Sequence, residues 1–93
     1  MSGYIKDPDS TLDYGIDWSR WLTEGESIVD SQWVVPADLT VVDNQFVSSG
    51  KTIVWLSGGV VGKRYTITNR ITTNSNPQSR VEDRSFTIRV REK

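Results

Sequence analysis

The sequence contains no cysteine and no histidine among its 93 residues. Without cysteine the chain has no disulfide framework, no thiolate metal site and no cysteine nucleophile. Without histidine it lacks the commonest general base, the usual zinc ligand and every Ser–His–Asp triad. These absences argue against an enzyme, and we predict no catalytic residue, no cofactor and no metal site.

Long hydrophobic runs are also missing. Residues 1–8 lack the apolar stretch that a signal peptide needs, and no segment approaches the roughly 18 apolar residues that span a bilayer. We therefore expect a soluble protein made in a cytoplasm, with no membrane partner. Because the chain begins with Met1 and ends in charged residues, we also expect a complete small gene product.

The composition fits one small globular domain. Hydrophobic residues make up 35% and charged residues 25% of the chain, which allows a small core and argues against disorder. We predict a flexible N-terminal arm over residues 1–10, because little apolar surface is available there to hold it. A single domain is expected over residues 11–93.

The sequence does contain a clear alternation of apolar and polar residues, which is typical of half-buried strands. The alternation is found at residues 12–18, 27–35, 64–72 and 86–91. A near-continuous apolar run at 53–56 predicts a strand buried on both faces or lying at an interface. A broken pattern at 39–47 predicts a strand with a bulge or bend near Asp43 and Asn44. Residues 19–24 suit one helical turn closed by Gly25, because Trp21 and Leu22 follow Trp18 by three and four residues.

These elements predict an all-β fold, a small antiparallel immunoglobulin-like β-sandwich of about six to seven strands with at most one short helical turn. The segment Gly62-Lys63-Arg64-Tyr65 favours this fold, because a Tyr just inside a strand after a glycine is typical of a tyrosine corner. A Tyr half-buried at a sheet edge is the alternative for this residue. An SH3-like or OB barrel is the rival fold.

Four tryptophans are many for this length. Trp18, Trp33 and Trp55 fall on inward or apolar positions, whereas Trp21 is expected to stay partly exposed beside Arg20. The predicted buried core includes Trp33, Trp55, Tyr65, Ile67, Phe86 and Ile88.

Charge is distributed unevenly along the chain. The net charge of −1 is the sum of −7 for residues 1–47 and +6 for residues 48–93, which predicts faces of opposite sign or pairing across strands. The alternation places four arginines on outward positions of two strands that we expect to be neighbours. These are Arg64, Arg70, Arg89 and Arg91.

Four like charges on one face suit an acidic protein partner, although an ordinary polar sheet face is the alternative. A nucleic-acid partner is not expected, because the chain is net acidic and no aromatic residue alternates with the arginines. Trp21 could insert into a partner's pocket, and Tyr4 and Ile5 could be ordered by a partner. The predicted protein-interface residues are thus Arg64, Arg70, Arg89, Arg91, Trp21, Tyr4 and Ile5.

Other patterns in the sequence give weaker indications of function. Asp13 and Asp17 would lie roughly 13 Å apart on one strand, too far for a catalytic carboxylate pair. The aspartates of residues 7–13 lack the glycine and the final acidic ligand of a calcium loop, so they fit turns and caps better. The glycines of residues 58–62 lack the lysine of a phosphate-binding loop, so they fit a turn.

Five blocks of the sequence, in this order, resemble a family of short proteins from tailed phages and prophages. They lie at residues 6–18, 28–36, 54–59, 65–73 and 83–92. Members of this family are described as phage fiber-tail adaptors or as Ig-like cement proteins that decorate the head.

The resemblance implies a non-enzymatic structural protein of a bacteriophage or prophage, which binds the virion surface or joins tail and fiber parts. Its partners would be other virion proteins of the capsid, tail or fiber, with a homo-oligomer on the virion as an option. It would occupy the host cytoplasm during assembly and then the virion. A carbohydrate-binding immunoglobulin-like module that uses Trp21 is the alternative.

Overall fold

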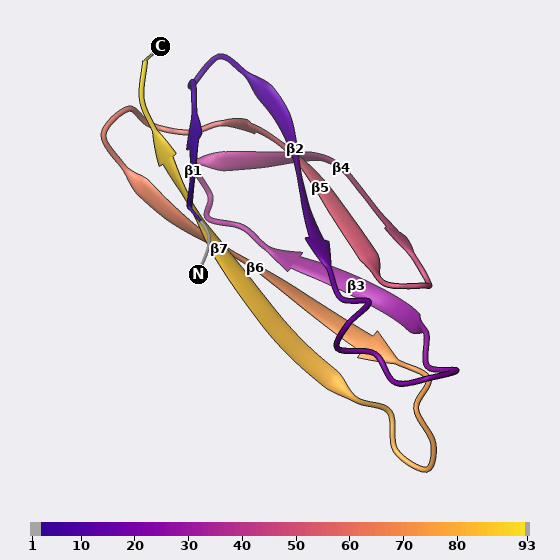
Figure 1. The fold of residues 1–93 in the computed structure, drawn as a ribbon. Coiled ribbons are helices and arrows are strands. Elements are labelled where there is room, and N and C mark those ends of the chain that lie inside the picture. The colour runs from indigo at the N-terminus through magenta and orange to yellow at the C-terminus, as the bar shows by residue number, and fades with distance from the viewer. Residues whose placement is uncertain (1–2, 93) are drawn as a thin grey trace.

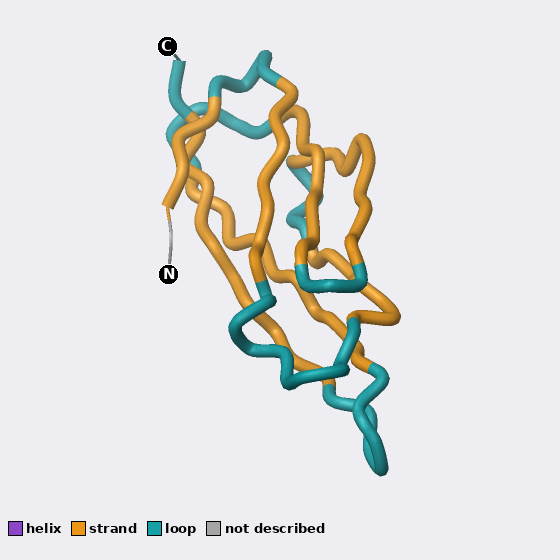
Figure 2. Tube along the Cα trace, turned by 45° about the vertical axis from the view of Figure 1, so that its right-hand side comes forward, coloured by secondary structure: helices purple, strands orange, loops and turns teal. Residues whose placement is uncertain are grey.

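The structure, a computed structural model, describes residues 3–92 and shows seven strands and no helix in that range (Figure 1). The strands form two sheets, which confirms the predicted small all-β sandwich. The molecule measures 47 × 22 × 19 Å, and the loops lie mainly at its two ends (Figure 2). The strands are β1 (Gly3–Lys6), β2 (Thr11–Asp17), β3 (Ile28–Val34), β4 (Leu39–Val47), β5 (Lys51–Gly58), β6 (Arg64–Thr73) and β7 (Val81–Val90).

One sheet has the strand order β1-β7-β6-β3 and the other has the order β2-β5-β4. All neighbours are antiparallel except β1, which runs parallel to β7 with Gly3 opposite Thr87. β6 and β7 pair over nearly their whole length, so the two arginine-bearing strands are neighbours as predicted. The predicted bulge in β4 is also present, as a register shift between Val41 and Asp43.

The core lies between the two sheets and is built mainly from every second residue of β5, β6 and the second half of β7. Tyr65, Ile67, Phe86 and Ile88 are buried as the alternation predicts. Trp33, predicted to be largely buried, is only half-buried and packs against the side of this cluster.

The prediction that Trp55 is buried is wrong. The inward row of β5 is Thr52, Val54 and Leu56, so Trp55 points away from the core and is 36% exposed. In the register it lies between Asp13 of β2 and Asp43 of β4, on the outer face of its sheet. A continuous apolar run does not reveal which residues face inward, and here one sheet face lies open.

A second buried cluster surrounds Trp18, which packs with Ile28 and Ile71. The indole Nε1 of Trp18 donates a hydrogen bond to Asn69 Oδ1 at 3.0 Å, and the Thr52 hydroxyl donates to the same oxygen at 2.7 Å. Asn69 in turn donates to Ser31 Oγ and to a backbone carbonyl of β3. One buried amide therefore connects both sheets, because its partners lie on β5 and β3 and at the end of β2.

The arm predicted over residues 1–10 contains a strand. Gly3–Lys6 forms β1 beside β7, and the Lys6 side chain is fully buried. Its ammonium group donates to the carbonyl oxygens of Asp7, Ser10 and Gly58 at 2.9, 2.6 and 2.8 Å. Three acceptors match its three protons, which is how a buried lysine is tolerated. Met1 and Ser2 of the predicted arm lie outside the described residues, and the flexibility of the arm stays a prediction.

Tyr65 forms the predicted corner at the start of β6. Its hydroxyl accepts a hydrogen bond from the Val60 N–H and donates to Asp38 Oδ2, both at 2.9 Å. The bonds from Tyr65 and Lys63 hold the pKa of Asp38 below its usual value. The corner therefore joins the β5–β6 loop to the β3–β4 connection at one end of the sandwich.

Candidate protein-interaction surfaces

Three of the four predicted interface arginines gather at one end of an outer sheet face. Arg64 of β6 lies directly opposite Arg89 of β7, and Ile5 of β1 lies on the other side of Arg89. Arg91 follows just beyond β7, where its N–H still donates to the Lys6 carbonyl at 3.0 Å. All four side chains are exposed. We call Ile5, Arg64, Arg89 and Arg91 the arginine patch.

The positive charge of this patch is unbalanced. Among residues 3–92, no carboxylate forms an ion pair with Arg64, Arg89 or Arg91. Like charges directly opposite on neighbouring strands repel, so the isolated chain is not stabilised by this arrangement. A carboxylate-bearing partner would convert the repulsion into attraction.

Arg70 lies on the same sheet face but does not belong to the patch. It is six residues from Arg64 along β6, about 20 Å away at strand spacing. Its guanidinium forms a two-pronged bond with the Asp83 carboxylate, with distances of 2.8 and 3.0 Å. This bond lowers the pKa of Asp83 and raises that of Arg70. The opposite charge across the ladder therefore satisfies Arg70 within the chain.

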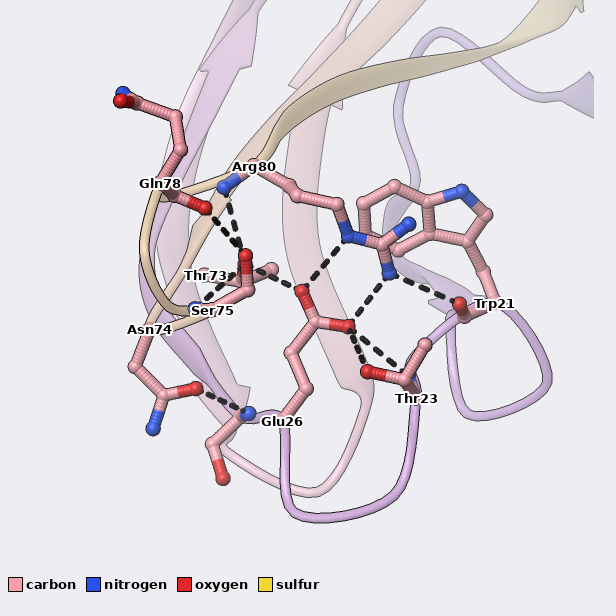
Figure 3. Close-up of polar contacts among 9 residues, drawn as sticks. Trp21, Thr23, Glu26, Thr73, Asn74, Ser75, Gln78 and Arg80 are labelled. Atoms are coloured by element: carbon pink, nitrogen blue, oxygen red, sulfur yellow. Dashed lines mark hydrogen bonds and ion pairs between the residues drawn. The ribbon is translucent and has the colours of Figure 1, made fainter.

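Trp21 lies at the end of the molecule opposite the arginine patch, and contacts within the chain hold it in place. It is half-buried in the β2–β3 loop, and the Arg80 guanidinium stacks on its ring, 3.8 Å from the centroid. Arg80 also binds the buried carboxylate of Glu26, with an Nε–Oε2 distance of 2.9 Å (Figure 3). Because Arg80 covers a face of the indole, Trp21 is not an open stacking platform.

Glu26 is the centre of this polar cluster. Its carboxylate accepts bonds from Arg80, from the Thr23 backbone and side chain, and from Thr73 (Figure 3). These bonds, above all the one from Arg80, hold the pKa of Glu26 far below its usual value. The cluster fastens the β2–β3 loop to the connection between β6 and β7. A polar cavity of about 270 Å³ lies beside it, lined by residues 23–26 and 74–76.

Tyr4 is separated from Ile5 by the alternation of β1. Ile5 faces outward, whereas the Tyr4 ring packs edge-on against Tyr14 and Phe86, with centroid distances of 5.2 and 5.4 Å. Tyr4 still remains 40% exposed because it lies at the edge of the sandwich. Burial between these rings raises the pKa of Tyr14 to about 12. Tyr4 therefore belongs to the gap between the sheets and not to the arginine patch.

The sequence analysis missed two of these features. Lys6 was not singled out, because its carbonyl partners include Gly58, which is distant in the sequence. Glu26 and Arg80 were not paired either, because 54 residues separate them. The only local signal was the Thr23–Glu26 spacing, in which a side chain binds a backbone N–H three residues away.

The described residues offer little for other kinds of site. Within residues 3–92, no three carboxylates come together as metal ligands. In the same range, no helix has the length and apolar character needed to cross a membrane. The exposed charged and apolar groups are instead suited to contacts with another protein.

Comparison with protein families identifies a related family. A family model described as podophage GP4 fiber-tail adaptor protein gp77 matches residues 6–89. No curated protein matches the chain. The family match extends from the last residue of β1 almost to the end of β7, so it includes both sheets.

Proposed function

The chain belongs to the podophage fiber-tail adaptor family, and we propose that it joins the two virion parts through separate surfaces, with the arginine patch binding the tail. Membership makes it a structural phage protein of the virion that connects tail and fiber. A connector needs at least two docking surfaces. The arginine patch is a flat, exposed group on a sheet face, which suits a large folded partner such as the tail.

The observation that carries this proposal is that Arg64 lies directly opposite Arg89 in the β6–β7 ladder and that no described carboxylate forms an ion pair with either. Arg70, further along the same sheet face, shows how the chain neutralises such a charge when a carboxylate is available, through Asp83. The patch lacks that neutralisation among the described residues, so it is suited to an acidic surface. Ile5 adds an exposed apolar group beside Arg89.

We propose further that the chain acts by binding and not by catalysis, and that it waits in the host cytoplasm before assembly.

The strand order supports the immunoglobulin-like assignment. In the constant-type immunoglobulin sandwich, the second, fifth and fourth strands share one sheet and the third, sixth and seventh share the other. The present order matches this for β2 to β7, whereas β1 joins the sheet of β7 and not that of β2. Loops and sheet faces of such sandwiches commonly serve as binding surfaces.

The test is binding of the purified chain to purified tails at low and high salt. Arg64→Glu and Arg89→Glu should weaken binding at low salt, mainly through slower association, because exposed charges act chiefly on the association rate. Each exposed pair contributes only about 0–1 kcal/mol, so the double variant should show the larger effect.

Lys51→Glu is the matched control, since it makes the same charge change on the outer face of the other sheet. It should bind tails as the parent does. Equal binding of the parent and both arginine variants at both salts would contradict the role of the patch. Binding to capsids in place of tails would favour the cement function of the resembling proteins.

A second candidate function, glycan binding, is favoured by Trp55. Trp21, its original basis, is covered by Arg80, but Trp55 lies exposed between Asp13 and Asp43 on neighbouring strands. An aromatic ring flanked by carboxylates can stack on a sugar and accept its hydroxyl hydrogens. Glycan-array binding that is lost in Trp55→Ala would support this function, and an array without binders would dismiss it.

A further inference from the structure

The β7 strand is only partly covered along one edge. β1 pairs with it from Thr87 to Val90, so the edge from Val81 to Ser85 has no strand beside it in the described chain (Figure 1). An uncovered edge presents backbone groups that can pair with another chain. The chemistry of this edge therefore depends on which backbone groups point outward.

The hydrogen bonds at the end of β7 settle that question. The Val90 N–H donates to Lys63 and its carbonyl accepts from Gly62, so even-numbered residues bond toward β6. Odd-numbered residues then turn toward the open edge, by the alternation of an antiparallel ladder. The Asp83 N–H donates only to the side chain of Glu82, at 3.2 Å. By the same alternation the Ser85 N–H points away from β6, and no described strand lies beside it on that side.

β2 presents a second open edge across the gap between the sheets. The Trp18 N–H donates to Gly50, so even-numbered residues of β2 bond toward β5. Gly15 and Asp17 therefore face the other way. The Asp17 carbonyl indeed accepts a hydrogen bond from Arg84 of β7 at 3.2 Å. Backbone groups of β2 and β7 that bond to no neighbouring strand therefore face the same gap between the sheets.

A cavity of about 200 Å³ occupies this gap. Small-molecule sites usually measure about 300–1,000 Å³, so the cavity is better suited to a single large side chain. Its walls include the rings of Tyr4 and Phe86 and the aliphatic side chain of Ile16. We call it the edge groove; its lining is Tyr4, Gly15, Ile16, Asp17, Arg84, Ser85 and Phe86.

We propose that the edge groove binds an extended terminal segment of the fiber protein. The segment adds as a strand to the open edge of β7 and places one large apolar side chain in the cavity. Main-chain donors and acceptors at strand spacing recognise an extended polypeptide, and the cavity selects its side chain. The groove accepts a single strand, which fits a fiber that is held at one end. This inference rests on the proposed adaptor function.

Charge does not favour a second copy of the chain as the occupant. The long exposed edge strand β4 carries Asp43 and no lysine or arginine. In the edge groove of another copy, Asp43 would meet the acidic Asp17 as well as the basic Arg84, which already binds the Asp17 carbonyl and stacks on Trp18. A segment of a different protein can instead place an opposite charge beside each of these two groups.

Hydrogen exchange of the parent chain tests the proposal without any substitution. In the free protein, the Ser85 amide should exchange much faster than the Phe86 amide, which bonds to β6. On addition of purified fiber protein, the Ser85 and Gly15 amides should slow by about tenfold or more, because strand addition bonds or buries them. A complex in which both amides exchange as in the free protein would overturn the proposal.

Binding of two Ser85 variants gives the matched comparison. Ser85→Pro removes the edge N–H and should bind fiber protein about tenfold more weakly, while its binding to tails stays unchanged. Ser85→Ala loses the hydroxyl contact with Thr68 but keeps the N–H, so it should bind fiber protein more tightly than Ser85→Pro and shows how much of the loss comes from the side chain. Thermal melting shows whether each variant is folded. If Ser85→Pro does not fold, the hydrogen-exchange experiment on the parent chain tests the proposal in its place.

The outcomes separate the two proposals. If the parent binds both tail and fiber but the edge amides stay unprotected or Ser85→Pro binds fiber normally, the groove assignment fails and the adaptor function stands. If fiber protein does not bind the parent at all, both fail. If the chain instead forms dimers that protect Ser85, a second copy is the occupant and the fiber assignment is wrong.

Discussion

At the scale of single residues, burial separates the tryptophans. Trp18 is fully buried and bonded to Asn69, so Trp18→Ala should cost about 3–5 kcal/mol of unfolding free energy and could unfold so small a domain. Trp55→Ala should cost about 1 kcal/mol or less, because that ring lies on an open face. Urea unfolding of both variants measures the difference. Equal losses of unfolding free energy in the two variants would show that Trp55 of β5 faces the core.

At the scale of elements, the Glu26–Arg80 bond makes the β2–β3 loop sensitive to acid. The pKa of Glu26 is lowered in the folded state, so its contribution to stability is full above the ordinary value of about 4.5 and is lost as the pH falls toward the lower, folded-state pKa. The melting temperature of the parent should therefore fall on acidification below about pH 4.5. Glu26→Gln should melt lower at neutral pH and fall less steeply in acid.

Glu24→Gln is the control for this prediction, because it removes a carboxylate from the same exposed loop and leaves the Glu26–Arg80 bond in place. Its melting curve should follow the parent at every pH. A Glu26→Gln variant as acid-sensitive as the parent would assign that sensitivity to Asp17, Asp38 or Asp83, whose pKa values are also lowered.

The strands show how far the sequence could be interpreted. Tyr65, Ile67, Phe86 and Ile88 were predicted correctly because strict alternation identifies an inward row. Alternation also predicted that Arg64 and Arg89 share a face, which the β6–β7 ladder confirms. It could not place Trp55, since the run from Ile53 to Leu56 has no polar residue to mark the outward side.

The sites depended on information that the local sequence does not contain. The Arg70–Asp83 pair depends on the register of a ladder, and the Lys6 environment depends on where the end of β5 lies. The edge groove arises because β1 is shorter than its neighbour β7. Strand lengths and registers are properties of the folded chain, so the predicted interface set divided into an arginine patch, an ion-paired Arg70, a groove residue and a covered tryptophan.

At the scale of the whole molecule, β1 protects the sandwich from self-association. Deleting residues 1–6 would remove the buried Lys6 and uncover the β7 edge from Val81 to Val90. The shortened chain should form dimers or larger species, because a long uncovered edge pairs with other chains. Size-exclusion chromatography with light scattering measures this. Ile5→Ser, which changes β1 only on its exposed side, should remain like the parent.

The parallel pairing of β1 and β7 also has a consequence for mechanical load. Because the two terminal strands run side by side in the same direction, a force that separates the two ends of the chain slides β1 along β7 (Figure 1). Sliding strains all the bonds of the ladder at once, together with the three bonds of the Lys6 ammonium group. Peeling would break them one by one at a lower force. The parallel pairing therefore gives the chain resistance to tension applied between its two ends.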